Sequence, residues 1–200
     1  MALLLLPPPP GLDSTEQRED LTQVLSLHAG VKSIDTNVIE FERHISVFTF
    51  KPVIGESFET NQLPKTAWFF HRVLQDSVLV VDVGRNYWER PRPYLIATNL
   101  ADGPPERFSG SYPSGHSTLA TVCALLLADI FPDKAEAILS KGKESGWHRV
   151  ILGRHYPSDI YAGRTLGRRI VQEMRRNRLF RHDFREARME LLSWAQANAF

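Results

Sequence analysis

The chain has 200 residues, which is enough for one domain with a substantial hydrophobic core. Its 24 basic and 23 acidic residues give a formal net charge of +1, so no strong overall field favours binding to nucleic acid or to a membrane surface. The single cysteine, Cys123, excludes an intramolecular disulfide, and its apolar neighbours predict a buried thiol without a catalytic role.

The first twelve residues differ in composition from the rest of the chain. The run Pro7 to Pro10 is incompatible with a helix and predicts an extended arm. We therefore expect residues 1–12 to form an arm and residues 13–200 to form a single helical domain. The leucines before the prolines lack the basic residues of a signal peptide. Two interpretations stay open: a mature chain whose signal has been removed, with Met1 added, or a disordered tail.

Helix signals begin directly after this arm. Asp13 or Ser14 can cap a first helix, because an acidic or amide residue follows each of them three positions later, and Gly30 ends it. A second helix is predicted over residues 33–48, where apolar side chains recur at helical intervals, at Ile34, Val38, Phe41 and Ile45.

The segment after residue 63 predicts one long helix. It starts near Pro64, a residue that suits the first helical position, and runs to about Trp88. Its valine-rich middle, "SVLVVDV", also fits a strand. We favour the helix, because the chain offers no second strand of similar quality to pair with it.

The second half of the chain predicts four further helices after a loop rich in Gly, Pro, Ser and Asp. They run from Pro113 or Ser114 to Phe131, from about Asp133 to Leu152, from Pro157 to about Asn177, and over the C-terminal end. The first is apolar nearly all round, which predicts a central position. It is too short to span a bilayer and contains Asp129. The predicted fold is an all-α, single-domain helical bundle without a transmembrane segment.

An arginine-rich segment spans Arg164 to Arg188, with nine arginines against three acidic residues. One interpretation is a helix that binds RNA or DNA. We favour a solvated helix face, because aromatic residues are sparse there and the overall charge is near zero. Salt-dependent binding to nucleic acid without phosphate release would support the first interpretation.

Three short blocks together indicate a phosphate site, although each alone is a weak signal. They are "RNYWERPRP" (Arg85 to Pro93), "PSGH" (Pro113 to His116) and "RVILGRHYPSD" (Arg149 to Asp159). Arginine side chains bind phosphoryl oxygens through forked hydrogen bonds. Ser114, Gly115 and His116 open a helix, whose N–H groups and dipole favour an anion.

The third block also contains a spaced histidine and carboxylate. His155 precedes a helix start and Asp159 follows four residues later, so the carboxylate can hydrogen-bond one imidazole nitrogen. The other nitrogen then carries the lone pair and can act as a nucleophile. A second histidine, His116, can protonate the leaving oxygen. The predicted active site therefore lies at loop–helix junctions.

The three blocks resemble the signature of the type 2 phosphatidic acid phosphatase superfamily, Lys-x6-Arg-Pro, Pro-Ser-Gly-His and Ser-Arg-x5-His-x3-Asp. With "SYPSGH" and "HYPSD", the chain looks most like the bacterial class A nonspecific acid phosphatases. The resemblance implies an all-helical phosphomonoester hydrolase without metal or cofactor, in which His155 forms a phosphohistidine, Asp159 activates it and His116 is the acid. It implies phosphate binding by Arg85, Arg92, Ser114, Gly115 and Arg149.

Two positions depart from this pattern. Arg85 stands where lysine is usual, which keeps the charge and changes shape and reach. His148 stands where serine is usual, and its role is uncertain: it could alter the phosphate site or be a packed helix residue.

Other functions remain to be distinguished. The related vanadium-dependent haloperoxidases hold vanadate in the same kind of pocket, and peroxide- and halide-dependent activity would identify one. A zinc hydrolase using His148, His155 and Asp159 fits no ordinary zinc spacing. The resemblance implies a phosphate ester as the partner and a periplasmic or secreted location, while the ester itself stays open, as does the oligomeric state, a homo-oligomer included.

Overall fold

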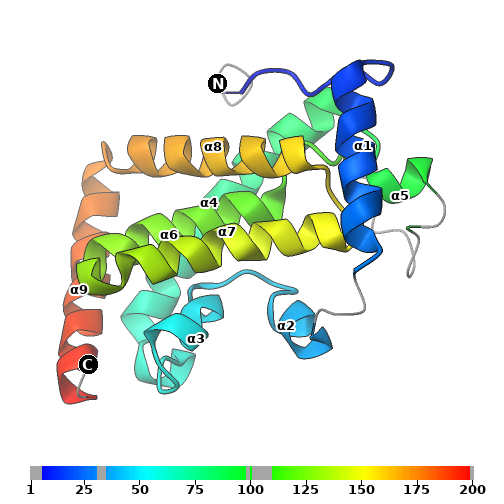
Figure 1. Cartoon of the computed structure of the whole chain (residues 1–200). Coiled ribbons are helices and arrows are strands. Elements are labelled where there is room, and N and C mark those ends of the chain that lie inside the picture. Colours follow the sequence, from blue (N-terminus) through cyan, green and yellow to red (C-terminus); the bar gives the residue numbers. More distant parts are fainter. Residues whose placement is uncertain (1–5, 31–34, 98–99, 101–109, 199–200) are drawn as a thin grey trace.

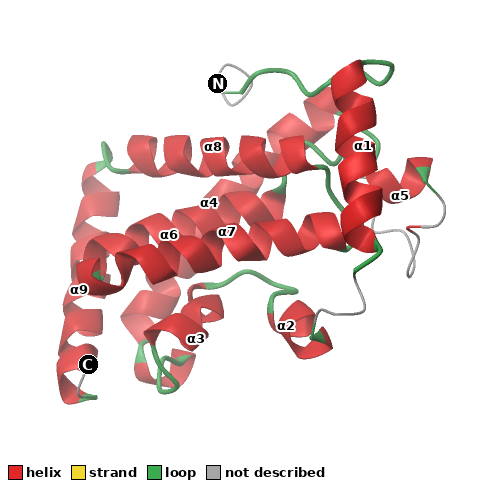
Figure 2. Ribbon diagram, in the orientation of Figure 1, coloured by secondary structure: helices red, strands yellow, loops and turns green. Residues whose placement is uncertain are grey.

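The computed structural model describes residues 6–30, 35–97, 100 and 110–198. These residues contain helices and no strand (Figure 2). The helices are α1 (Thr15–His28), α2 (Thr36–Phe41), α3 (Lys51–Ile54), α4 (Pro64–Trp88), α5 (Pro93–Ile96), α6 (Gly115–Ile130), α7 (Ala135–Ile151), α8 (Pro157–Met174) and α9 (Arg178–Ala197), with short 3₁₀ turns η3 (Val47–Phe50), η4 (Thr60–Gln62) and η6 (Pro132–Lys134). The predicted all-α fold is confirmed.

Most helix boundaries lie where local signals predict them. The side chain of Ser14 caps α1 by accepting the N–H of Gln17 at 3.1 Å. Ser114 caps α6 in the same way. Proline occupies the first position of α4 and of α8. The valine-rich middle of α4 is helical, so the strand alternative is wrong.

Helix α6 is the centre of the fold. It packs against α4, α7, α8 and α9, and its side chains are apolar nearly all round. Cys123 on this helix is fully buried, and burial raises the pKa of its thiol, as expected for an unreactive core residue.

Glycines let the neighbouring helices approach α6 closely. A Cβ on Gly163 of α8 would lie 2.6 Å from the carbonyl oxygen of Ser114, which is closer than real Cβ atoms come to other atoms. On α7, a Cβ on Gly142 would lie 2.8 Å from the Cβ of Ala124. These contacts explain why α7 and α8 tolerate residues that weaken isolated helices.

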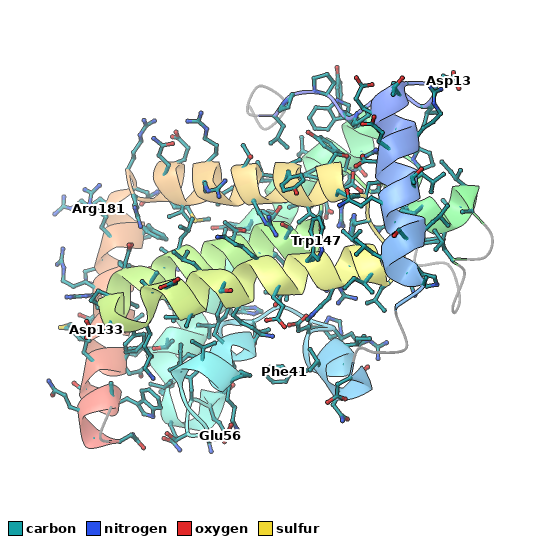
Figure 3. All side chains as sticks on the ribbon, in the orientation of Figure 1. Asp13, Phe41, Glu56, Asp133, Trp147 and Arg181 are labelled. Atoms are coloured by element: carbon teal, nitrogen blue, oxygen red, sulfur yellow. The ribbon has the colours of Figure 1, made fainter. Side chains whose placement is uncertain are left out.

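The predicted helix over residues 33–48 is wrong in most of its length. Only Thr36–Phe41 is α-helical, and the chain leaves the helix at Glu42. Phe41, one of the apolar residues that recur at helical intervals, is 45% exposed (labelled in Figure 3). Ile34 lies outside the described residues. Glu42 is instead buried against α7, and this tertiary contact overrides the helical periodicity.

The described part of the N-terminal arm is not helical and packs on the rest of the chain. Leu6 is buried in the core, and the hydroxyl of Tyr112 donates a hydrogen bond to the carbonyl oxygen of Pro7 at 2.7 Å. Residues 1–5 lie outside the described part. Among the described residues, no helix combines the length and apolar character that crossing a bilayer requires.

The fold brings several helix ends to one side of the molecule. Helix α7 ends and α8 begins beside α1, at the right of Figure 1. Helices α6 and α8 start close together, because the backbone N–H of Ser114 donates to the carbonyl oxygen of Asp159 at 3.1 Å. The second and third sequence blocks therefore meet at this side.

Candidate active site

The turn between α7 and α8 positions His155. Gly153 adopts a positive φ of 66°, a conformation that side chains rarely allow. The chain then folds back, so that the N–H groups of Arg154 and His155 both donate to the carbonyl oxygen of Arg149, at 2.9 and 3.2 Å. As a result, His155 lies over the end of α7 and is only 2% exposed.

His155 is held by Asp159 on one side and faces Arg92 on the other. Its Nδ1 lies 3.3 Å from Oδ2 of Asp159, and its Nε2 lies 3.2 Å from Nη1 of Arg92. Burial and the charge of Arg92 lower the pKa of His155 to about 3, against the hydrogen bond to Asp159, which raises it. The imidazole is therefore neutral, with its proton on Nδ1 and its lone pair on Nε2.

Arg90, which lies in the first sequence block but has no place in the family pattern, holds the second oxygen of Asp159. Its Nη1 donates to Oδ1 at 2.6 Å, and its guanidinium also binds Asp20 and Gln17 of α1. Burial raises the pKa of Asp159, but the hydrogen bond from His155 and the charge of Arg90 outweigh this and keep it below its ordinary value. Asp159 therefore stays ionised although it is fully buried.

At the start of α6, a guanidinium packs directly on the helix backbone. A Cβ on Gly115 would lie 2.8 Å from Nη2 of Arg85, so any side chain there would displace this guanidinium from the start of α6. Nε of Arg85 donates to the carbonyl oxygen of Pro113 at 3.3 Å. The arginine at the position where the family pattern has lysine is thus placed against the anion-favouring end of α6.

Ser114 differs in detail from the sequence-based expectation. Its backbone N–H is engaged by the carbonyl oxygen of Asp159, so it is not free to donate to a phosphate in this arrangement. Its hydroxyl oxygen accepts the N–H of Ser117 at 3.4 Å and keeps its own proton for donation. Any contact of Ser114 with an anion would therefore come from the side chain.

His155 and Arg92 form one wall of the candidate site, and His116 and Arg149 form the second wall. Nη2 of Arg149 donates to Nε2 of His116 at 2.5 Å and to the carbonyl oxygen of Glu42 at 3.0 Å. The same Nε2 lies 3.1 Å from the carbonyl oxygen of Arg43, which would accept its proton if the ring were charged. Burial, followed by the charge of Arg149, lowers the pKa of His116 to about 3.

His148 is not part of the second wall, because its side chain bonds Glu42. Its Nδ1 lies 2.7 Å from Oε2 of Glu42, whose other oxygen accepts from Lys141 and Ser145, at 2.8 and 2.9 Å. Burial raises the pKa of Glu42, but the hydrogen bonds from His148 and Lys141 lower it to about 2. The structure thus favours the packed-residue interpretation of His148.

These residues form a cluster with an excess of positive charge. The charge of Arg85 lowers the pKa of both His116 and His155. The buried carboxylate of Asp159 is paired with Arg90, and Arg92 and Arg149 each bring a guanidinium group to one of the two histidines. Two neutral imidazoles among three guanidinium groups suit a phosphate dianion.

The family model of the PAP2 superfamily matches residues 69–181, which include all of these blocks. The chain belongs to the PAP2 superfamily. A PAP2 relative at 31% identity is the non-specific acid phosphatase of Salmonella typhimurium, with 81% of this chain and 68% of the relative covered. The acid phosphatase of Zymomonas mobilis is 33% identical, with 68% of this chain and 53% of the relative covered.

A solved PAP2 structure shares the fold. It is the transmembrane PAP2 type phosphatidylglycerolphosphate phosphatase from Bacillus subtilis, with a TM-score of 0.54 and 20% identity. The match covers 81% of this chain and 86% of the other. At this identity, the likeness concerns the fold.

The described residues bear on two of the other sequence-based hypotheses, the zinc hydrolase and the arginine-rich helix. His148 pairs with Glu42 while His155 pairs with Asp159, and no group of three or more potential ligands is placed for a metal ion within the described part of the chain. In the arginine-rich segment, Arg175 pairs with Asp129. The guanidinium of Arg164 lies 5.9 Å from the ring centroid of Trp147, at α7 facing α8 (Figure 3).

Proposed function

We propose that the protein is an acid phosphatase-type hydrolase of phosphomonoesters that forms a phosphohistidine on His155. The observation that carries this proposal is the orientation of the imidazole. Asp159 fixes the proton on Nδ1, and Nε2 faces the guanidinium of Arg92 at 3.2 Å, where a phosphoryl group would be bound. Membership of the PAP2 superfamily and the likeness to acid phosphatases support the same activity.

Binding would place the phosphoryl group between the two walls. Arg92 and Arg149 donate at present to Nε2 of His155 and of His116, and the phosphoryl oxygens would take over these donors. The N–H groups at the start of α6, with Arg85 beside them, would bind the remaining oxygen. These donors are already in position before the substrate binds, so less reorganisation is needed to reach the transition state.

The first chemical step transfers the phosphoryl group to the enzyme. The lone pair on Nε2 of His155 forms a bond to phosphorus, and the bond between phosphorus and the ester oxygen breaks. The bound phosphate offsets the neighbouring cations, so His116, which is neutral in the ligand-free site, takes up a proton when the ester binds. It gives this proton to the departing oxygen, so that the alcohol leaves neutral. Asp159, still ionised, stabilises the positive charge that develops on the imidazole of His155.

The second step releases phosphate. A water molecule attacks the phosphorus of the phosphohistidine, the P–N bond breaks, and its electron pair returns to Nε2 of His155. His116, which is neutral after the first step, takes a proton from the water. Phosphate then leaves, and both histidines are again in their starting protonation states once His116 has lost or passed on this proton.

The test is a rapid acid quench with a phosphomonoester labelled in its phosphate. The wild-type protein should carry label on a histidine, and His155→Ala should carry none and lose turnover. His148→Ala is the matched control, because this histidine bonds Glu42 and should still permit labelling. Label on a serine, or an unlabelled wild type that still turns over, would contradict the phosphohistidine. Bromide oxidation by peroxide with vanadate, without phosphate release, would instead indicate the haloperoxidase alternative.

A periplasmic or secreted location is also part of the proposal and is supported by the likeness to non-specific acid phosphatases. Fractionation of cells expressing the natural gene, with phosphatase activity followed in each fraction, tests it. Activity confined to the cytoplasmic fraction would contradict this location and leave the chemical proposal intact.

A further inference from the structure

A pocket of about 620 Å³ adjoins the candidate active site. It lies between the outer face of α4, the segment 43–48 and the start of α6. This volume falls in the range of roughly 300–1,000 Å³ that is usual for small-molecule sites. The pocket is thus large enough for an organic group of ring size or larger.

His116 belongs to both the pocket and the anion site. Its ring lines the pocket, and its Nε2 accepts from Arg149. The carbonyl oxygen of Arg43, which also lines the pocket, lies 3.1 Å from the same nitrogen. The leaving oxygen that receives a proton from His116 would therefore be attached to an organic group that lies in this pocket.

Apolar side chains make up about half of the lining of this pocket, and the polar ones include Arg43, His44 and His71. The apolar side chains include Phe48, Phe70, Leu74, Val78 and Leu119. Among the described residues that line it, there is no carboxylate, so nothing repels the phosphate of an approaching ester. Burial of an apolar group against such side chains is favourable, by roughly 25 cal/mol for each Å² of surface removed from water.

We propose that this pocket binds the organic part of the substrate and makes the enzyme prefer phosphomonoesters of apolar alcohols of ring size or larger. The inference rests on the proposed function, since it takes His116 as the group that protonates the leaving oxygen. It adds the substrate class that the phosphate site alone does not determine. The preference comes from the pairing of α4 with the segment 43–48, which lies outside the three sequence blocks.

The experiment compares kcat/KM for 2-naphthyl phosphate and phenyl phosphate, whose leaving groups are phenols of similar acidity. The wild type should prefer the naphthyl ester by about 10-fold, the size of effect that extra apolar contact gives in a hydrophobic pocket. Hexyl phosphate should likewise be preferred over glycerol phosphate, because the organic group of glycerol phosphate is polar.

Two substitutions on α4 should move this ratio in opposite directions. Val78→Glu places a carboxylate in the pocket and should bring the naphthyl-to-phenyl ratio close to one. Gln75→Leu makes the lining more apolar and should raise the ratio. Both residues are exposed, so both variants should fold, which circular dichroism would check. Val83→Glu is the matched control: Val83 lies on the same helix, is 50% exposed and is outside the pocket, so ratio and rates should stay unchanged.

The outcomes separate this inference from the proposed function. Hydrolysis of both aryl esters with equal kcat/KM, or equal ratios in the wild type and both pocket variants, would overturn the pocket and leave the phosphatase proposal standing. Absence of phosphate release from every ester would overturn the proposed function itself.

Discussion

The carboxylate of Glu42 lies 2.7 Å from Nδ1 of His148, and through its backbone carbonyl the same residue accepts a hydrogen bond from Arg149 at 3.0 Å. One residue outside the three sequence blocks therefore links the arginine of the anion site to the unusual histidine that precedes it. Because Glu42 accepts a hydrogen bond from Arg149, it can influence the position of this arginine without contacting the substrate.

Glu42→Gln should change the pH dependence of stability. The pKa of Glu42 is lowered from 4.5 to about 2, so its ionised form contributes stability above pH 4.5 that is lost as the pH falls towards 2. The variant should be less stable at neutral pH, by about 1–3 kcal/mol for hydrogen bonds to a charged group, and should lose less on acidification. Urea unfolding at several pH values measures this.

Glu59→Gln is the control for that experiment, because Glu59 pairs with Lys51 at the surface and is about half exposed. Surface pairs contribute at most about 1 kcal/mol, so its unfolding midpoint should follow that of the wild type. Parallel pH curves for the wild type and Glu42→Gln would contradict the ion pair.

His148→Ser restores the residue type of the family pattern and should leave the phosphate site intact. His148 contacts Glu42 and Glu144, and the anion site faces the other side of Arg149. We expect vanadate to inhibit the variant as it inhibits the wild type, with some loss of stability. A large change in the inhibition constant would mean that His148 acts on the anion after all.

Arg90→Met should destabilise the protein strongly. It leaves the carboxylates of Asp20 and Asp159 buried without their cation, a change that costs about 3–5 kcal/mol in typical cases. Arg175→Met, which breaks a half-exposed pair with Asp129, should cost at most about 1 kcal/mol. Denaturant unfolding compares the two, and equal losses would show that Arg90 has no special role in holding Asp159.

Anion binding should be accompanied by proton uptake. The pKa of His116 is about 3 in the ligand-free arrangement, because burial and neighbouring cations disfavour its charged form. A bound dianion offsets these cations and raises the pKa of His116, so binding of sulfate, which is already a dianion at pH 5 to 6, should take up a proton. Calorimetry in buffers of different ionisation enthalpy measures the number, and His116→Ala should abolish it. Uptake that persists in this variant would assign the proton to another group.

His116→Ala should affect poor leaving groups most. Alkyl phosphates need protonation of the departing oxygen, and loss of a general acid costs on the order of 10²–10⁴-fold. Nitrophenyl phosphate leaves as a stable phenolate and should be less affected. The ratio of mutant to wild-type kcat/KM for the two esters is the measurement, and equal ratios would exclude His116 as the acid.

The sequence predicts the elements whose signals are local and misses those set by distant contacts. Proline at the start of α4 and α8 and the serine cap of α6 mark boundaries within a few residues, and the structure places them there. The helix expected over residues 33–48 fails because Glu42 leaves it to bond Lys141 on α7, about a hundred positions further on. No periodicity in that segment contains this information.

The same reasoning applies to the site. The spacing of His155 and Asp159 predicts their contact, because Asp159 lies in the first turn of α8 and can reach back to the residues just before the helix. Arg90 was overlooked although it lies in the first block, since its partners Asp20 and Gln17 are on α1, some seventy positions away. The pocket beside His116 combines α4 with the segment 43–48, and nothing in either stretch indicates that they face each other.

The glycine contact between α8 and α6 has a consequence for mutational maps. Gly163 lets α8, which follows the turn that holds His155, approach α6, which carries His116, so closely that even a methyl group would collide with the carbonyl oxygen of Ser114. Any larger side chain there would move His155 and His116 apart by changing the spacing of the helices, without altering either histidine. In a scan scored only by turnover, Gly163 would rank beside the two proposed catalytic histidines, although it has no proposed contact with substrate. Protein abundance measured in parallel would not separate Gly163 from these histidines, because a variant with a slightly larger distance between α6 and α8 can still fold.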